Sequence, residues 1–302
     1  MEKMVKQGQL LFPVALMASG AEQLICVYFG PPARFIIPWV PGNPFLAYLV
    51  GLALLAAGLS IATNRRARLS AFLLGFLFLL CVLLIWVPKA AARPLNASVR
   101  TVVFETLAFC GSALTLAGLL PAEKWFLGRW ERAVNGLIES GPYLFAVSLM
   151  AFGIDHFLAL DFVASLVPSW IPGRGLFWAY LTGTVFIAAG VSIATGWMAR
   201  WAATLLGIMF LLWFLLLHSP GAVSASLSHN PNSPNEWSSA FIALGCAEGP
   251  GFRPGILCRA ERRHPQIKVR SDLCLVRPKT YVHVHSRGPL EARRSIFHRQ
   301  SI

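Results

Sequence analysis

The octapeptide AAGLSIAT at residues 56–63 recurs almost unchanged as AAGVSIAT at residues 188–195. The likeness extends outward, so that residues 51–88 align with residues 183–220 without a gap and twenty of the 38 positions are identical. Shared Leu, Ala and Phe are common in any two apolar helices, but less common matches also coincide: Gly58 with Gly190, Ser60 with Ser192, Thr63 with Thr195, Arg68 with Arg200 and Pro88 with Pro220. The chain therefore contains an internal repeat.

The repeat lies in a chain that is 56% hydrophobic and only 13% charged. Soluble domains carry about 25% charged residues, and a run of about 20 apolar residues is long enough to cross a bilayer as a helix. Seven such runs occur, at about 9–29, 44–63, 70–88, 101–121, 142–160, 176–195 and 201–218, and a shortened eighth begins at Trp237 and ends at Cys246. We predict an all-α membrane protein with seven full spans and a shortened eighth, surrounded by the lipid bilayer.

The repeat divides these spans into two four-helix units, 1–121 and 142–245, joined by a linker at 122–141. Four is an even number, so both units enter the membrane from the same side and the repeats are parallel, an arrangement that many transporters use. Plain duplication of a small bundle that once formed a homodimer also explains the repeat, and we favour it over a transport-specific meaning. We interpret the linker as an amphipathic helix in the cytoplasmic headgroups, with a solvated connector as the alternative.

Loop charges predict the orientation, because cytoplasmic loops carry more Lys and Arg. Nine basic residues lie on the side of the N-terminus: Lys3, Lys6, Arg65, Arg66, Arg68, Lys124, Arg129, Arg132 and Arg200. Five lie on the other: Arg34, Lys89, Arg93, Arg100 and Arg174. We predict a multi-pass protein of the inner (plasma) membrane with a cytoplasmic N-terminus.

Polar side chains inside the apolar runs are the candidate functional residues. Inserting a carboxylate into the membrane as part of a span costs roughly 2.5–3.5 kcal/mol of free energy, so such a residue is retained only where it has a role. The prediction places them in two polar pockets, one in each unit: Glu22, Gln23, Arg100 and Glu105 in the first, and Asp155, His156 and His218 in the second. An Asp with a His can relay a proton to a ligand. The alternative is a structural role near the helix ends.

The motif Arg100-Thr101-Val102-Val103-Phe104-Glu105-Thr106-Leu107-Ala108, with the Ala57-Gly58 pair and the basic turn after it, resembles the DoxX-like family of bacterial membrane proteins. The family takes its name from a subunit tied to thiosulfate:quinone oxidoreduction. The resemblance implies a bacterial inner membrane, other membrane or redox subunits as partners, and a quinone as the ligand. The second unit departs from the motif, with Trp237 in place of Arg100 and Ile242 in place of Glu105.

The tail at 246–302 holds twelve Lys and Arg against four acids and has no helical or strand periodicity. It is either a basic cytoplasmic tail attracted to anionic lipids or an out-of-frame translation that replaces the end of the eighth helix. In both cases we expect it to be poorly ordered. The basic excess is concentrated there and does not indicate nucleic acid as a partner.

The function stays open between three classes. One is a quinone-linked redox membrane subunit, the second is a small-solute carrier, and the third is a structural or assembly protein without catalysis, so an enzymatic activity is not assigned. No haem, Fe–S or flavin motif is present, and the six scattered cysteines form neither a C-x-x-C pair nor a Cys/His cluster, so no metal site is predicted.

Overall fold

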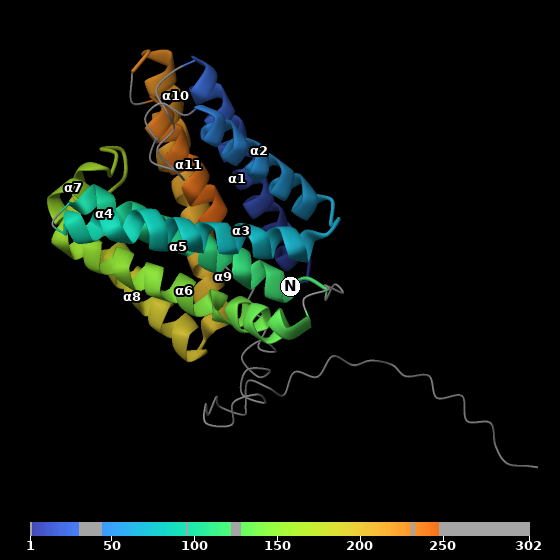
Figure 1. Cartoon of the computed structure of the whole chain (residues 1–302). Coiled ribbons are helices and arrows are strands. Elements are labelled where there is room, and N and C mark those ends of the chain that lie inside the picture. The colour runs from blue at the N-terminus through green and yellow to red at the C-terminus, as the bar shows by residue number, and fades with distance from the viewer. Residues whose placement is uncertain (1, 30–43, 95, 122–127, 231–232, 248–302) are drawn as a thin grey trace, which may run out of the picture. The chain divides into compact units, whose positions relative to one another are not determined.

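The computed structural model describes residues 2–29, 44–94, 96–121, 128–230 and 233–247, and within these ranges all regular structure is helical (Figure 1). Six longer helices are α1 (Glu2–Phe29), α2 (Pro44–Ala62), α5 (Ala97–Leu119), α6 (Glu131–Leu158), α8 (Gly175–Thr195) and α11 (Ser233–Cys246). Two more each contain a π-helical turn: α3 (Ala67–Cys81), η1 (Val82–Trp86) and α4 (Val87–Ala92) in one, and α9 (Ala199–Trp213), η3 (Phe214–His218) and α10 (Ser219–Leu227) in the other. Short pieces are η2 (Gly128–Trp130) and α7 (Leu160–Ser165).

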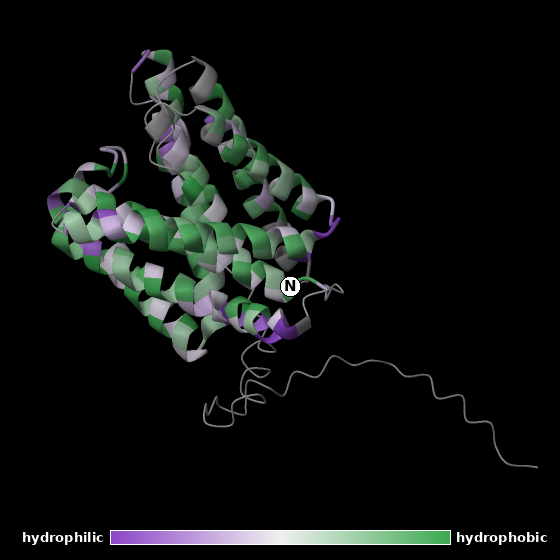
Figure 2. Ribbon diagram, viewed as in Figure 1, coloured by the Kyte–Doolittle hydropathy of each residue, from purple (hydrophilic) through white to green (hydrophobic). Residues whose placement is uncertain are grey.

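Five of these helices are long and apolar enough to cross a membrane: Ala67–Ala92, Ala97–Leu119, Glu131–Leu158, Gly175–Thr195 and Ala199–Leu227. Two shorter apolar helical segments, Leu10–Ile25 and Tyr48–Ala62, accompany them. Hydrophilic residues gather at helix ends, and apolar residues cover the helices between them (Figure 2). The prediction of an all-α protein with several membrane-crossing helices is confirmed at this level.

Prolines explain the two π-helical turns. Proline has no backbone N–H, and its ring clashes with the carbonyl group four residues earlier, so a helix that continues through it can widen locally, as it does here but not at Pro142 of α6. Pro88 follows the π-helical segment Val82–Trp86, and Pro220 follows Phe214–His218. The same distortion thus occurs at aligned positions of the two halves.

The turns before α3 and α9 also share a conformation. Asn64 and Arg66 have φ of 54° and 50°, and the aligned Gly196 and Met198 have φ of 75° and 51°. In each turn a serine hydroxyl of the preceding helix donates to a backbone carbonyl five residues later, Ser60 to Arg65 and Ser192 to Trp197. The repeated AAG(L/V)SIAT stretch therefore ends in the same tight, left-handed turn both times.

The helices pack in two series. In one series α3 lies against α5, α5 against α6, and α6 against α8; in the other, α2 lies against α1, α1 against α11, and α11 against η3 and α10 (Figure 1). Each series combines the first two helices of one predicted unit with the last two of the other. The predicted units 1–121 and 142–245 are therefore not two separately packed bundles, because α5 packs along α6 of the other half.

The core of the first series is centred on α5, whose residues from Ala108 to Ala117 are all buried. Phe109 contacts the rings of Phe12 on α1 and Phe78 on α3, with centroids 5.7 and 5.8 Å apart. These aromatic contacts hold α5 against both helices and fix the side of α5 that faces α6.

The predicted linker at 122–141 ends earlier in the structure than expected, because α6 already begins at Glu131. Residues 122–127 lie outside the described residues, and Glu131 begins α6, which continues without a break through Pro142 to Leu158. The boundary expected at residue 141 is absent: Gly141 lies within α6 and gives it a close approach to α5, where an added Cβ would lie 2.6 Å from the Thr115 nitrogen. The eighth helix is short, as predicted, and ends at Cys246. The tail at 248–302 lies outside the described residues.

Candidate functional site

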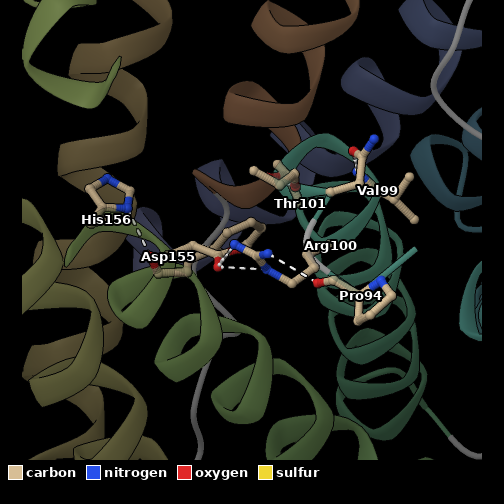
Figure 3. Close-up of polar contacts among 9 residues, drawn as sticks. Pro94, Val99, Arg100, Thr101, Asp155 and His156 are labelled. Atoms are coloured by element: carbon tan, nitrogen blue, oxygen red, sulfur yellow. Dashed lines mark hydrogen bonds and ion pairs between the residues drawn. The ribbon is translucent and has the colours of Figure 1, made fainter. Parts of the chain in front are cut away.

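Arg100 and Asp155 form an ion pair that joins α5 to α6 (Figure 3). Arg100 Nε and Nη2 both donate to Asp155 Oδ1, at 3.2 and 3.1 Å, and Nη1 donates to the carbonyl oxygen of Pro94 at 3.2 Å. The side chains are 25% and 16% exposed. Asp155 Oδ2 is buried without a hydrogen-bond partner in the described part of the chain. One carboxylate oxygen thus holds the guanidinium, and the other can accept a further donor.

The start of α5 sets the position of Arg100. Asn96 is the N-cap of α5, and its side-chain Oδ1 accepts a hydrogen bond from the Val99 N–H at 3.0 Å. Such a cap satisfies one of the free N–H groups of the first turn. Because the helix begins there, the guanidinium of Arg100 reaches back to Pro94 and across to α6.

His156 follows Asp155 on α6, and its ring is surrounded by aromatic side chains. The Nδ1 atom lies 2.8 Å from the Phe152 carbonyl oxygen. A carbonyl can only accept, so Nδ1 carries a hydrogen and Nε2 is left to accept or donate elsewhere. The imidazole packs edge-to-face on Phe186, with centroids 5.1 Å apart, and is stacked on Trp213 at 6.5 Å. We call Arg100, Asp155 and His156 the Asp155 cluster.

The first predicted pocket is not assembled as expected. Arg100 is engaged by Asp155, whereas Glu22 accepts a hydrogen bond from the Ser238 hydroxyl of α11, with 2.9 Å between Oγ and Oε1. Gln23 is buried beside Glu22. The physical reason is the packing of the fourth helices: α5 lies on α6 and α11 lies on α1, so each first helix meets the fourth helix of the other half.

Glu105 and His218 remain apart from both groups. Glu105 makes no hydrogen bond or ion pair with any described residue, and its predicted association with Arg100 is absent, since the arginine is bonded to Asp155 and Pro94. His218 closes the π-helical turn η3 and makes no hydrogen bond with Asp155 or His156. Of the second predicted pocket, the structure thus brings together only Asp155 and His156, which are adjacent in sequence.

Three partners of the candidate residues were missed from the sequence: Ser238, Phe186 and Trp213. Ser238 follows Trp237, the residue aligned with Arg100, so the fourth-helix alignment could have indicated it. Phe186 and Trp213 could not be distinguished from ordinary core aromatic residues, because nothing in their spacing differs from that of other apolar positions. No group of three or more His, Cys, Asp or Glu side chains gathers in the described ranges.

Comparison with known proteins gives one partial match. A family model described as a domain of unknown function (DUF8561) matches residues 145–244, a segment that begins within α6 and ends within α11. No curated protein and no solved structure matches the chain. The segment 145–244 is thus similar to a protein family for which no function is described.

Proposed function

We propose that this chain is a DoxX-like protein of the bacterial inner membrane that binds a quinone head group beside His156, as the membrane subunit of a redox system. The observation that carries this proposal is the setting of the imidazole. Its Nδ1 is occupied by the Phe152 carbonyl, and the ring contacts Phe186 edge-to-face and Trp213 by stacking, so Nε2 is the polar atom that it can offer to a ligand. Flat aromatic surroundings with one hydrogen-bonding group fit a quinone ring, which is itself flat and carries carbonyl oxygens.

The chemistry of the chain's own residues fits such a ligand. A bound quinone would supply the acceptor for two electrons and two protons. His156 can hold a proton on Nε2 and donate it to a carbonyl oxygen, which is the role that imidazole performs near neutral pH. Asp155, fixed by Arg100, anchors the same turn of α6 to α5 and so orients the histidine. The electron donor would have to be a partner subunit.

Replacing His156 by alanine is expected to weaken the binding of a short-chain ubiquinone about three- to tenfold, because one hydrogen bond contributes roughly 0.5–1.5 kcal/mol. Binding of the tritiated quinone to the full chain in lipid nanodiscs would be measured by scintillation proximity. His229→Ala, which removes an exposed histidine just after α10, is the control and should bind like the wild type. Absence of saturable quinone binding to the wild-type protein would refute the proposal.

The proposal includes a duplicated four-helix unit and eight membrane-embedded helices. It is supported by the aligned π-helical turns, by the matching left-handed turns, and by the equivalent hydroxyl bonds of Ser60 and Ser192. The family model at 145–244 covers nearly one such unit. In this view α1 and α2 are spans like their counterparts α6 and α8, and α11 is the shortened eighth.

The proposed orientation places the N-terminus and the connector before α6 in the cytoplasm. The described basic residues of the α2–α3 turn, Arg65 and Arg66, are exposed, as are Arg129 and Arg132 near the start of α6. Arg129 lies over the ring of the exposed Trp130, 5.5 Å from its centroid, a pairing that suits a membrane interface.

Epitope tags at the N-terminus and in the connector at 122–127 are expected to report the same, cytoplasmic face. A tag in the loop between α7 and α8, next to the exposed Trp170, should report the other face. The measurement is tag accessibility to antibody in spheroplasts before and after permeabilisation. If the tags at the N-terminus and in the connector report opposite faces of the membrane, the parallel arrangement is wrong.

A further inference from the structure

Four buried polar residues meet where α1 faces α11. Ser19, Glu22 and Gln23 of α1 are 3%, 9% and 7% exposed, and Ser238 of α11 is 5% exposed. Residues three and four apart lie on the same face of a helix, so the three α1 residues share a face. The Ser238 hydroxyl donates to Glu22 Oε1. We call these four residues the Glu22 cluster.

The Glu22 cluster holds more polar atoms than its protein partners satisfy. Ser19 Oγ is buried and has no hydrogen-bond partner in the described ranges. Gln23 makes no hydrogen bond with a described residue, and Ser238 is the one described partner of Glu22. Buried polar groups are almost always paired with protein or ordered water. The unsatisfied groups therefore indicate that something polar and small, such as water, completes this cluster.

The charge around Glu22 differs from that around Asp155. Asp155 has the guanidinium of Arg100 on its Oδ1, whereas no cation among the described residues reaches Glu22. Of the other helices that contact α1, α2 contributes Tyr48 as its one titratable residue, and α11 contributes Glu236 and Cys246. Helix α5, whose Phe109 contacts Phe12 of α1, contributes Arg100, Glu105 and Cys110, and the one cation among these is paired with Asp155. Between Leu10 and Ile25 on α1, Glu22 is the one charged residue. An ionised carboxylate without a cation is costly in such apolar surroundings.

We propose that the Glu22 cluster is a proton-binding site within the membrane, in which the Glu22 carboxyl holds one proton at neutral pH. The proton binds at Oε2, while Oε1 keeps the Ser238 hydroxyl as its donor. Ser19 and Gln23 hold the water through which the proton enters and leaves. Asp155, in contrast, is paired with the Arg100 guanidinium. The two clusters thus differ in charge state, and this assignment does not depend on quinone binding.

Infrared difference spectroscopy of the full chain in nanodiscs tests the charge states directly. The wild-type spectrum minus that of Glu22→Gln should contain the carbonyl stretch of a protonated carboxylic acid at neutral pH. The wild-type spectrum minus that of Asp155→Asn should contain carboxylate bands instead. Ser238→Ala should keep the protonated band and shift it, since its hydrogen-bond donor is lost. A carboxylate band for Glu22 at neutral pH would overturn the proposal.

Labelling with dicyclohexylcarbodiimide, which reacts with protonated carboxyls in membranes, provides an independent test. Mass spectrometry of the labelled chain should find the adduct on Glu22 and not on Asp155, and Glu22→Gln should lose it. Labelling that is unchanged by sodium ions supports a proton as the bound species. If sodium but not potassium protects Glu22 from labelling, the site binds sodium and the proton assignment is wrong. A chain that is labelled at Glu105 but not at Glu22 would also contradict the proposal.

Discussion

Replacing Gly111 by leucine is expected to separate α5 from α6 and to leave little correctly folded protein. A Cβ at this position would lie 2.5 Å from the Phe145 nitrogen and 2.8 Å from the Gly141 carbonyl oxygen. Both are backbone atoms of α6, so no side chain can turn aside and the helices themselves must move apart. Small residues allow such close approach where helices pack in lipid. Overpacking alone costs about 1–3 kcal/mol, and leucine adds further volume.

The matched control for this prediction is Gly136, which lies on the exposed side of α6. A Cβ there would meet nothing within 4 Å, so Gly136→Leu should fold normally and gain up to about 1 kcal/mol of helix propensity. Fluorescence-detected size-exclusion chromatography and thermal unfolding in detergent would compare the two variants. Equal yield and equal midpoint for Gly111→Leu and Gly136→Leu would show that the α5–α6 contact does not limit folding.

The positions of the helices were predictable because each depends on a local pattern. Apolar length alone predicted the segment 176–195, and the structure has α8 at Gly175–Thr195. The ends of the aligned helices at Thr63 and Thr195 were predictable too, since both lie in the repeated stretch, and both hydroxyls donate to the carbonyl four residues earlier. The π-helical turns were not predicted, although Pro88 and Pro220 explain them in physical terms.

The packing partners of the fourth helices could not be predicted. In lipid, the apolar faces of α5 fit α1 or α6 equally well by hydropathy, because no water drives one pairing over the other. The choice rests on shape, namely the contact of Gly111 with Gly141 and the packing of Phe109 between Phe12 and Phe78, with tilted and edge-on rings. A repeated unit read from sequence therefore predicts which helices exist, but not which of them pack together.

The same limit applies to the candidate site. The sequence singled out Arg100, Asp155 and His156 because ionisable residues inside membrane spans are energetically costly and usually have a structural or functional role. It grouped Arg100 with the wrong partner, since the expected partner Glu22 lies on α1 and the observed partner Asp155 lies on α6. Residue type thus indicated that these side chains matter, and only the fold showed which of them meet.

Replacing Arg100 by leucine is expected to destabilise the folded protein by about 3 kcal/mol, because Asp155 would keep a largely buried charge without its cation. The midpoint of unfolding in sodium dodecyl sulfate, followed by tryptophan fluorescence, measures this loss. The control is Arg174→Leu, which removes an exposed arginine at the N-cap of α8 and should change the midpoint little.

The double variant Arg100→Leu with Asp155→Leu distinguishes an ion pair from simple packing. If the loss in the single variant comes from an uncompensated carboxylate, removing that carboxylate should restore most of the stability, as is found for buried pairs replaced by apolar residues. A double-mutant cycle would then give a coupling free energy of roughly 1–3 kcal/mol. Additive losses would instead mean that Arg100 acts through its bond to Pro94 and that α5 and α6 are held by shape alone. In that case the anchoring of His156 by Asp155 would lose its physical basis, while the aromatic contacts of the imidazole would still hold.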